Sequence, residues 1–185
     1  MTDERLLTRA RQGDEAAFVA LYERHRGLVF RFAYRLLQSA ELAEEITHDC
    51  FMQLLKEPQR FVADDQRAAL ATWLCAIARN LAFKRLRHSG RETELDEWAD
   101  ALPAWETDEP LRRVLAGELA EAIRHAVAAL PPLQREALIL FEYEELSLRE
   151  IAAIADVDIG TIKARLHRAR ASLRVALAPY QERCL

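Results

Sequence analysis

The chain has 185 residues, a formal net charge of −4 and 51% apolar residues, so it is long enough to bury the core of one large domain or two small ones. Five Gly and six Pro against many Ala, Leu, Arg and Glu favour helices over strands and predict an all-α fold. The N-terminus lacks a hydrophobic signal core, and no stretch approaches the roughly 18 to 20 apolar residues that span a bilayer, so we expect no membrane insertion and a cytoplasmic location.

The N-terminal half shows four helical patterns, and a loop precedes the last one. The patterns cover residues 2–11, 15–38, 40–56 and 72–88. Pro58, Asp64 and Asp65 disfavour a continuous helix through residues 56–66. We therefore expect a substantial loop before the helix that begins near Trp73. We assign the Trp73 side chain to the core, because large aromatic residues dominate cores.

The predicted helix 40–56 has two chemically different sides. Apolar residues cover one broad side, whereas the other side groups Glu45, His48, Asp49 and Met52. An exposed methionine among acidic residues is unusual for a merely solvated face, so this side indicates a binding surface; an ordinary solvated acidic face is the alternative. His48 and Cys50 point about 200° apart on a helix, which argues against a metal site there.

The charges fall in blocks of alternating sign. Residues 79–91 contain five basic residues and no acid, residues 92–109 contain eight acids and no base, and residues 159–181 contain five basic residues and no acid. The acidic stretch has poor helical periodicity and contains Pro103, which is typical of a linker. We therefore predict helical domains at residues 1–90 and 112–185, joined by an acidic linker at 91–111.

The C-terminal half carries the signals of a helix-turn-helix. A helical pattern over 111–130 ends at Pro131 and Pro132, and a second pattern continues through residue 143. Ser147 with Glu150 three residues later predicts a capping box at the start of a helix that stops near residue 156. Asp158 then suits the N-cap of a helix from residue 159, so the pattern is helix, four-residue turn, helix.

The last long helix has one apolar stripe and a basic remainder. The predicted buried stripe is Ile162, Leu166, Ala169 and Leu173. Lys163, His167, Arg170 and Arg174 form a flank, and Thr161, Ala164 and Arg168 lie toward the far side from the core. This layout suits a recognition helix in a DNA major groove, whereas an Arg-rich solvated helix is the alternative.

Three stretches together resemble one family. The sequence LPPLQREALILFEYEELSLREIAAIADVDIGTIKARLHRARASLR at 130–174 resembles region 4 of extracytoplasmic-function (ECF) sigma factors. The stretches AELAEEITHDCFMQLLK and ATWLCAIARNLAFKRLRH are similar to region 2 of the same family, in the same order. The family usually has Gln at the position of His48 and Asp at the position of Lys84. The first departure leaves the affinity for polymerase open, and the second leaves the preferred minus-10 sequence open.

The resemblance implies a dissociable subunit that binds core RNA polymerase, at the β′ clamp helices and the β flap, and directs it to promoter DNA. In this family, region 4 reads the minus-35 element as duplex, and region 2 opens and reads the minus-10 element as single strand. The resemblance also implies control by an anti-sigma factor. We expect the free chain to be a monomer, because it lacks an evident dimerisation helix.

Three sets of contact residues follow from the resemblance and from the helix faces. The polymerase-binding set is Glu45, His48, Asp49 and Met52. The minus-10 set is Phe61, Arg67, Arg79, Asn80, Lys84, Arg85 and Arg87, of which the first two lie in the loop that forms the base pocket. The minus-35 set is Thr161, Lys163, Ala164, Arg165, His167, Arg168, Arg170 and Arg174.

Two other function classes are weaker interpretations. A stand-alone helix-turn-helix regulator would usually dimerise on a palindromic site, and it would leave the N-terminal half without a role. An enzyme is not expected, because the chain has no phosphate-binding loop, nucleophile elbow or zinc-protease motif, and we expect no cofactor and no metal. The acidic linker could repel DNA, thread the RNA channel of the polymerase, or mask the basic faces.

Overall fold

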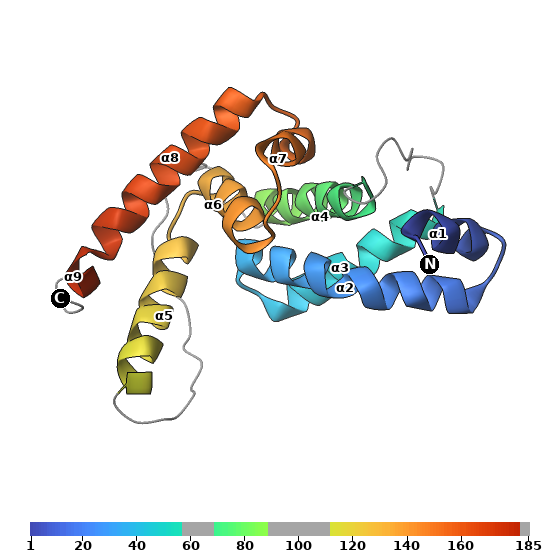
Figure 1. Cartoon of the computed structure of the whole chain (residues 1–185), viewed down its shortest axis with the longest axis horizontal. Helices are drawn as coiled ribbons and strands as arrows, with labels where there is room; N and C mark the ends of the chain where they lie inside the picture. The colour runs from blue at the N-terminus through green and yellow to red at the C-terminus, as the bar shows by residue number, and fades with distance from the viewer. Residues whose placement is uncertain (57–68, 89–111, 182–185) are drawn as a thin grey trace.

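In the computed structural model, residues 1–56, 69–88 and 112–181 are described. All regular structure in these ranges is helical, which confirms the predicted all-α fold (Figure 1). The elements are α1 (Asp3–Arg11), α2 (Glu15–Leu37), α3 (Ala40–Lys56), α4 (Ala69–His88), α5 (Arg112–Ala128), α6 (Pro132–Leu138), η3 (Ile139–Tyr143), α7 (Leu148–Ala155), α8 (Ile159–Ala176) and α9 (Ala178–Gln181). No helix within these ranges combines the length and the apolar character that a membrane crossing requires.

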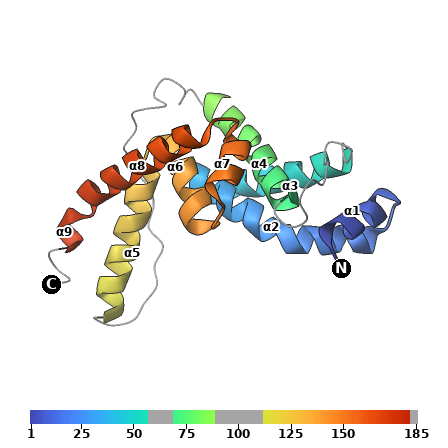
Figure 2. The same cartoon turned by 45° about the horizontal axis from the view of Figure 1, so that its top comes forward.

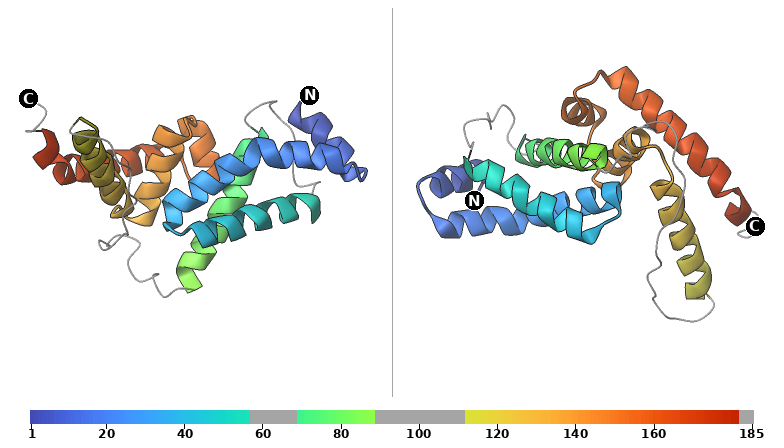
Figure 3. Two further views of the ribbon diagram at one scale, coloured as in Figure 1. Left: turned by 90° about the horizontal axis from the view of Figure 1, so that it is seen from below. Right: turned by 180° about the vertical axis from the view of Figure 1, so that it is seen from behind.

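Helices α1 to α4 form the N-terminal bundle, in which α2 contacts each of the other three. Figure 3 shows α2 and α3 side by side with α4 crossing them. The largest fully buried side chains of this bundle are Leu6, Leu21, Phe32, Leu36, Ile46, Leu54 and Leu74. The buried residues of α2 and α3 recur at helical spacing, so these helices bury one apolar side and leave the other side in solvent.

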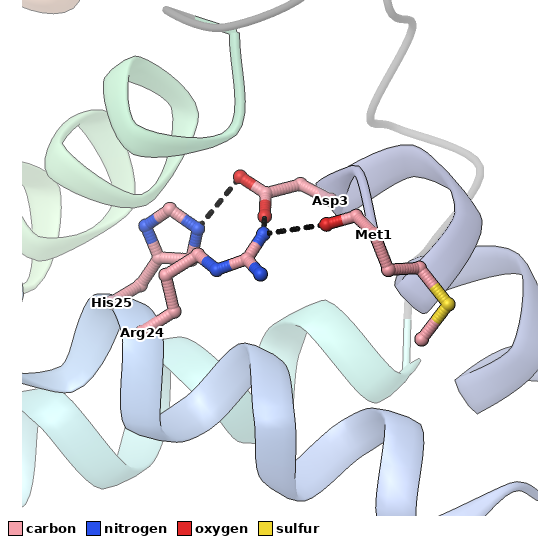
Figure 4. Close-up of polar contacts among 4 residues, drawn as sticks. All are labelled: Met1, Asp3, Arg24 and His25. Carbon is pink, nitrogen blue, oxygen red and sulfur yellow. Dashed lines mark hydrogen bonds and ion pairs between the residues drawn. The ribbon is translucent and has the colours of Figure 1, made fainter.

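Polar contacts tie α1 to α2 at the N-terminus of the chain (Figure 4). The carboxylate of Asp3 contacts Nε2 of His25 at 2.8 Å and also accepts a hydrogen bond from the guanidinium of Arg24. Arg24 donates a second hydrogen bond to the backbone carbonyl of Met1 at 3.2 Å. Since His25 is buried, this group of contacts fixes the position of the first helix.

Two cysteines lie in the core of the N-terminal bundle as free thiols. Cys50 on α3 and Cys75 on α4 are both fully buried. Burial raises the pKa of Cys75 to about 12 and raises the pKa of Cys50 further above its usual range. Because the thiolate is the reactive form, burial disfavours reaction at both side chains. Cys184 lies outside the described residues.

Helices α5 to α9 with η3 form the C-terminal unit. Pro132 occupies the first turn of α6, as predicted. The predicted continuous helix through residue 143 is wrong in one detail, since α6 ends at Leu138 and the chain continues as the π-helical turn η3. This wider turn brings the backbone N–H of Leu146 to the carbonyl of Leu140, at 3.0 Å, so it links α6 to the start of the helix-turn-helix.

The N-terminal bundle and the C-terminal unit share one apolar core. Helix α4 packs against α7 (Figure 2), and α2 contacts α6 and η3. Buried residues of both parts, such as Leu74 and Ile151, belong to one continuous cluster. The half-buried Trp73 packs against this cluster, in agreement with its predicted place in the core. The described chain therefore adopts a closed arrangement in which α4 lies next to the helix-turn-helix.

Candidate nucleic-acid and polymerase interface

The helix-turn-helix formed by α7 and α8 is fixed by its own side chains. The Ser147 hydroxyl accepts from the Glu150 N–H at 3.3 Å, and the Glu150 carboxylate accepts from the Ser147 N–H at 2.8 Å, so the predicted capping box is confirmed. Asp156 ends α7 in the left-handed region at φ 53°. The Asp158 carboxylate accepts from the Thr161 N–H at 2.8 Å, which confirms the predicted N-cap.

The apolar side of α8 holds the helix against the rest of the C-terminal unit. Ile162, Leu166 and Ala169 are buried, and Leu173 packs half-buried against a second small cluster with Val127. The predicted apolar stripe is therefore confirmed. It fixes which side chains of α8 face solvent.

The solvent side of α8 is strongly basic. Lys163, Ala164, His167, Arg168 and Arg174 are exposed. Within the described residues, no acidic side chain forms an ion pair with the basic members of this set, which are Lys163, His167, Arg168 and Arg174. The small Ala164 leaves the backbone approachable at the start of the helix. The surface thus offers open positive charge next to a helix N-terminus, as a nucleic-acid phosphate requires.

Two other predicted contacts on α8 are already engaged within the chain. The Thr161 hydroxyl donates to the Asp158 carboxylate at 2.6 Å, and these hydrogen bonds hold the pKa of Asp158 below its usual value. Arg170 donates to the Glu142 carboxylate at 2.7 Å and lies over the ring of Phe141. Both hydrogen bonds are on the surface. A DNA phosphate can therefore replace the carboxylate as the acceptor for Thr161 or Arg170.

Arg165 is the predicted α8 contact that faces inward. Its side chain is only 11% exposed, and its Nη1 lies 3.7 Å from Oε2 of the fully buried Glu136 on α6. The other oxygen of Glu136 accepts a hydrogen bond from Nε of Arg79 on α4, which is 18% exposed. Burial raises the pKa of Glu136, and the two guanidinium groups oppose that shift. In this conformation, neither arginine presents its guanidinium to DNA.

The remaining predicted minus-10 residues on α4 lie at the surface. The exposed members are Asn80, Lys84, Arg85 and Arg87. Arg85 forms an ion pair at 3.0 Å with Glu45 of α3, and both side chains are about half exposed. Phe61 and Arg67 lie outside the described residues, as does the predicted acidic linker. Within the described residues, the minus-10 set is therefore represented by α4, with Arg79 facing inward and the other four members exposed.

The predicted polymerase-binding residues share one exposed face of α3. These residues are Glu45, His48, Asp49 and Met52. Met52 is 37% exposed, and Leu55, which the sequence reasoning missed, is 42% exposed and lies three residues further along the helix. Its spacing from Met52 was the signal that could have identified it. The face combines acidic groups with an apolar pair.

The sequence also gave no indication of two buried acids. Glu136 contacts Arg79 and Arg165, and Glu144 contacts Arg31 at 3.4 Å and Arg35 at 2.8 Å. Each acid joins the C-terminal unit to the N-terminal bundle. Their partners are remote in the sequence, so no local pattern marks them.

Two family models match the chain, Sigma-70 region 2 over residues 21–92 and Sigma-70, region 4 over residues 120–173. The chain is also 31% identical over 189 residues to the ECF RNA polymerase sigma-E factor of Escherichia coli K12, with 97% of this chain and 96% of that protein covered. The chain belongs to the ECF sigma factor family. This sigma factor is 28% identical over 185 residues to SigW of Bacillus subtilis, with 96% and 97% coverage. It is 34% identical over 173 residues to SigE of Mycolicibacterium smegmatis, with 91% of its own length and 65% of that protein covered.

Solved structures agree with this membership. The sigma factor RpoE of Bartonella quintana, crystallised with the anti-sigma factor NepR, is 28% identical and superimposes with a TM-score of 0.65 over 87% of this chain and 96% of that chain. CnrH in complex with the cytosolic domain of CnrY gives a TM-score of 0.67 over 96% and 97%, and at 22% identity it supports the fold alone. The family predicted from the sequence is thus confirmed: the chain is an alternative sigma factor, a class of transcription regulators rather than enzymes.

Proposed function

We propose that this sigma factor binds core RNA polymerase through α3 and places α4 and α8 on the minus-10 and minus-35 elements of promoter DNA. The proposal includes no catalytic step and no cofactor. It places the protein in the cytoplasm, where polymerase and chromosome are found, and assigns residues 1–90 and 112–185 to the two promoter elements. Each contact set named from the sequence keeps its proposed role.

The basic face of α8 is the observation that carries the proposal. Its exposed residues Lys163, His167, Arg168 and Arg174 are not neutralised within the described part of the chain. They lie on α8, which its Asp158 N-cap and its buried apolar stripe hold in position. Lys163 and Arg174 suit phosphate contacts, whereas Arg168 and Ala164 lie where base edges would be read.

The α3 face supports the polymerase contact. Met52 and Leu55 form an exposed apolar pair beside Asp49, and such a pair contributes most when a partner covers it. The polymerase sites proposed are the β′ clamp helices for this face and the β flap for the C-terminal unit. The free protein acts as a monomer before it binds.

Run-off transcription tests the proposed function. Purified core polymerase is incubated with a pool of promoter fragments, with and without the protein. Discrete start sites that share two upstream elements support the proposal. DNA binding without programmed initiation, in an assay where a known sigma factor works, would instead favour a stand-alone regulator. The Arg168→Ala variant should lose initiation, and Arg5→Ala, an exposed arginine on α1, is the matched control.

An anti-sigma factor is proposed as the regulator. Its candidate binding site is a cavity between the N-terminal bundle and the C-terminal unit. The cavity has a volume of about 700 Å³ and lies between α2, α5 and η3. Its lining includes the stacked rings of Phe30 and Tyr34 together with Tyr143. Arg31 and Arg124 also line it, and they pair with Glu144 and Glu121. An aromatic lining beside charged pairs suits an amphipathic segment of a partner.

The proposed binding site for the anti-sigma factor is tested with proteins that copurify with the full chain. A copurified protein that suppresses run-off transcription by the wild type, and suppresses it less for Tyr34→Ala, supports the assignment. Equal suppression of both proteins would place the regulator elsewhere.

A further inference from the structure

One arginine on the basic flank of α8 is held by two side chains of the turn η3. Nε and Nη2 of Arg170 donate to Oε1 of Glu142, at 3.2 and 2.7 Å. The same guanidinium lies over the ring of Phe141, with its central carbon 5.2 Å from the ring centroid. Adjacent residues of one turn thus contact the guanidinium at its edge and at its face.

The edge of Arg170 that Glu142 occupies is one that arginine uses for phosphate. The N–H groups of Nε and one Nη point the same way and bind a carboxylate or a phosphate through two parallel hydrogen bonds. In Arg170, both of these donors are bound to a single carboxylate oxygen. Glu142 therefore occupies the place of a DNA phosphate, and the two acceptors compete for the same guanidinium.

The other basic residues of this flank are in a different state. The flank consists of Lys163, His167, Arg170 and Arg174. Within the described residues, Arg170 is the member of this row that pairs with an acid, although His167 and Arg174 are its neighbours on the helix surface. A row of open cations attracts any duplex through its phosphates, which carry no sequence information. The pairing of a central member therefore limits the part of DNA binding that is independent of sequence.

The turn η3 fixes the position of both side chains that hold Arg170. Phe141 is half-buried and packs against the apolar core, so the core sets the position of its ring. The turn itself is π-helical, and the backbone N–H of Glu144 donates to the carbonyl of Ile139 at 3.1 Å. Glu142 and Arg170 are 45% and 48% exposed, so their hydrogen bonds exchange for others without disturbing the core.

We propose that Glu142 is a specificity-determining residue, which withholds Arg170 from random duplex DNA and releases it to a phosphate at the promoter. This inference rests on the proposed function, because it requires that α8 binds duplex DNA. Phosphate contacts supply essentially all of the affinity for random DNA, so the loss of one contact lowers that affinity directly. At a promoter, base contacts fix the register of α8, which keeps a phosphate beside Arg170 and favours the exchange.

The first experiment measures binding of the full-length protein to a labelled duplex of random sequence, by fluorescence anisotropy at several salt concentrations. Glu142→Gln should bind about two- to fivefold more tightly, which is the range that an exposed ion pair allows. Its slope of log affinity against log salt should be steeper by about 0.9, because one more phosphate is contacted. Glu142→Gln combined with Arg170→Ala should lose both gains.

The second experiment measures selectivity in the complex with core polymerase. Transcription from a promoter recovered by the run-off assay is challenged with the random duplex as competitor. Without competitor, Glu142→Gln should initiate as the wild type does, but about two- to fivefold less competitor should halve its transcription. Glu118→Gln, at an exposed position on α5, makes the same change of net charge and is the matched control in both experiments.

The outcomes separate this role of Glu142 from the proposed function. Unchanged affinity and slope in Glu142→Gln would overturn the inference, as would a gain that persists when Arg170 is also replaced. A tighter grip on random DNA with unchanged sensitivity to competitor would overturn the specificity role. If Lys163→Ala binds the duplex as the wild type does, α8 is not the DNA-binding helix and the proposed function fails. If Lys163→Ala binds more weakly while Glu142→Gln is unchanged, this inference alone fails.

Discussion

The two surfaces proposed to meet DNA differ in how much of their positive charge is available. On α8, Lys163 and Arg168 are exposed with no acidic partner among the described residues. On α4, Arg79 pairs with the buried Glu136 and Arg85 pairs with Glu45 of the α3 face. The comparison indicates that Lys163 and Arg168 of α8 are ready to meet duplex DNA although Arg165 and Arg170 are paired there. On α4, Arg79 and Arg85 must first exchange partners.

The proposed polymerase contact is linked to this difference. Glu45 belongs to the set that we propose to face polymerase, and it also pairs with Arg85 of the proposed minus-10 set. On this proposal, engagement of Glu45 by polymerase frees the Arg85 guanidinium for the opened strand. Exposed ion pairs contribute at most about 1 kcal/mol, so this coupling changes an affinity by no more than about fivefold.

The largest expected effect concerns the core that both surfaces share. Ile162→Ala in the helix-turn-helix and Ile46→Ala in the N-terminal bundle each remove a fully buried side chain. Each should lower the free energy of unfolding by about 2 to 5 kcal/mol. Because the apolar cluster is continuous, we expect a single urea transition that shifts as a whole in both variants. Two separate transitions, with only one displaced by each variant, would contradict a shared core.

The next effect tests the α3 face. Met52→Asp should weaken binding of core polymerase about tenfold or more, since central apolar contacts of an interface contribute roughly 2 kcal/mol or more. The fold should be retained because Met52 is 37% exposed. Fluorescence anisotropy of the labelled protein with core enzyme measures the affinity. Val19→Asp, at an exposed position on α2, is the control and should bind as the wild type does.

A smaller effect compares free and paired charges on α8. Lys163→Ala should weaken binding to all duplex sequences and flatten the slope of log affinity against log salt by about 0.9. Arg170→Ala should flatten it less, because Arg170 already pairs with Glu142. Titrations at several salt concentrations supply the slopes, with Arg5→Ala as the control. Loss of discrimination at one base pair with an intact slope would mean that Lys163 contacts a base.

The smallest effect concerns the cap of α8. Hydrogen bonds from Thr161 hold the pKa of Asp158 below its ordinary value of 3.8, so its stabilisation is present above that pH and is lost as the pH falls through the lower folded pKa. Asp158→Ala should therefore lower Tm more at pH 7 than near pH 2. Asp158→Asn, which also caps, should retain most of the stability. An equal loss of Tm at both pH values would exclude the carboxylate as the cause.

The sequence predicted those features whose causes are local. The capping box of Ser147 and Glu150 and the N-cap at Asp158 depend on residues three positions apart, and the apolar stripe of α8 depends on helical spacing. The helix over residues 40–56 was predicted with its observed bounds for the same reason. Signals of this range are complete within one segment of the chain.

The features that the sequence did not reveal depend on distant partners. Arg79 and Glu136 are separated by 57 positions, and Arg35 and Glu144 by 109. From the sequence, Arg79 and Arg165 were expected on open DNA-binding faces, because a basic run indicates a phosphate contact whether or not another helix covers it. The π-helical turn η3 was missed as well, since it shares the apolar pattern of an α-helix.

Permanganate footprinting of the complex of core polymerase, this sigma factor and a promoter tests the central claim, that α8 reads a duplex element and α4 holds an opened one. Permanganate marks unpaired thymines, and nuclease protection marks the bound duplex. Arg168→Ala should abolish protection of the upstream element, whereas Lys84→Ala should leave that protection in place and reduce thymine reactivity at the downstream element. If both variants reduce both signals equally, or if the two effects are exchanged, the assignment of the two helices is wrong.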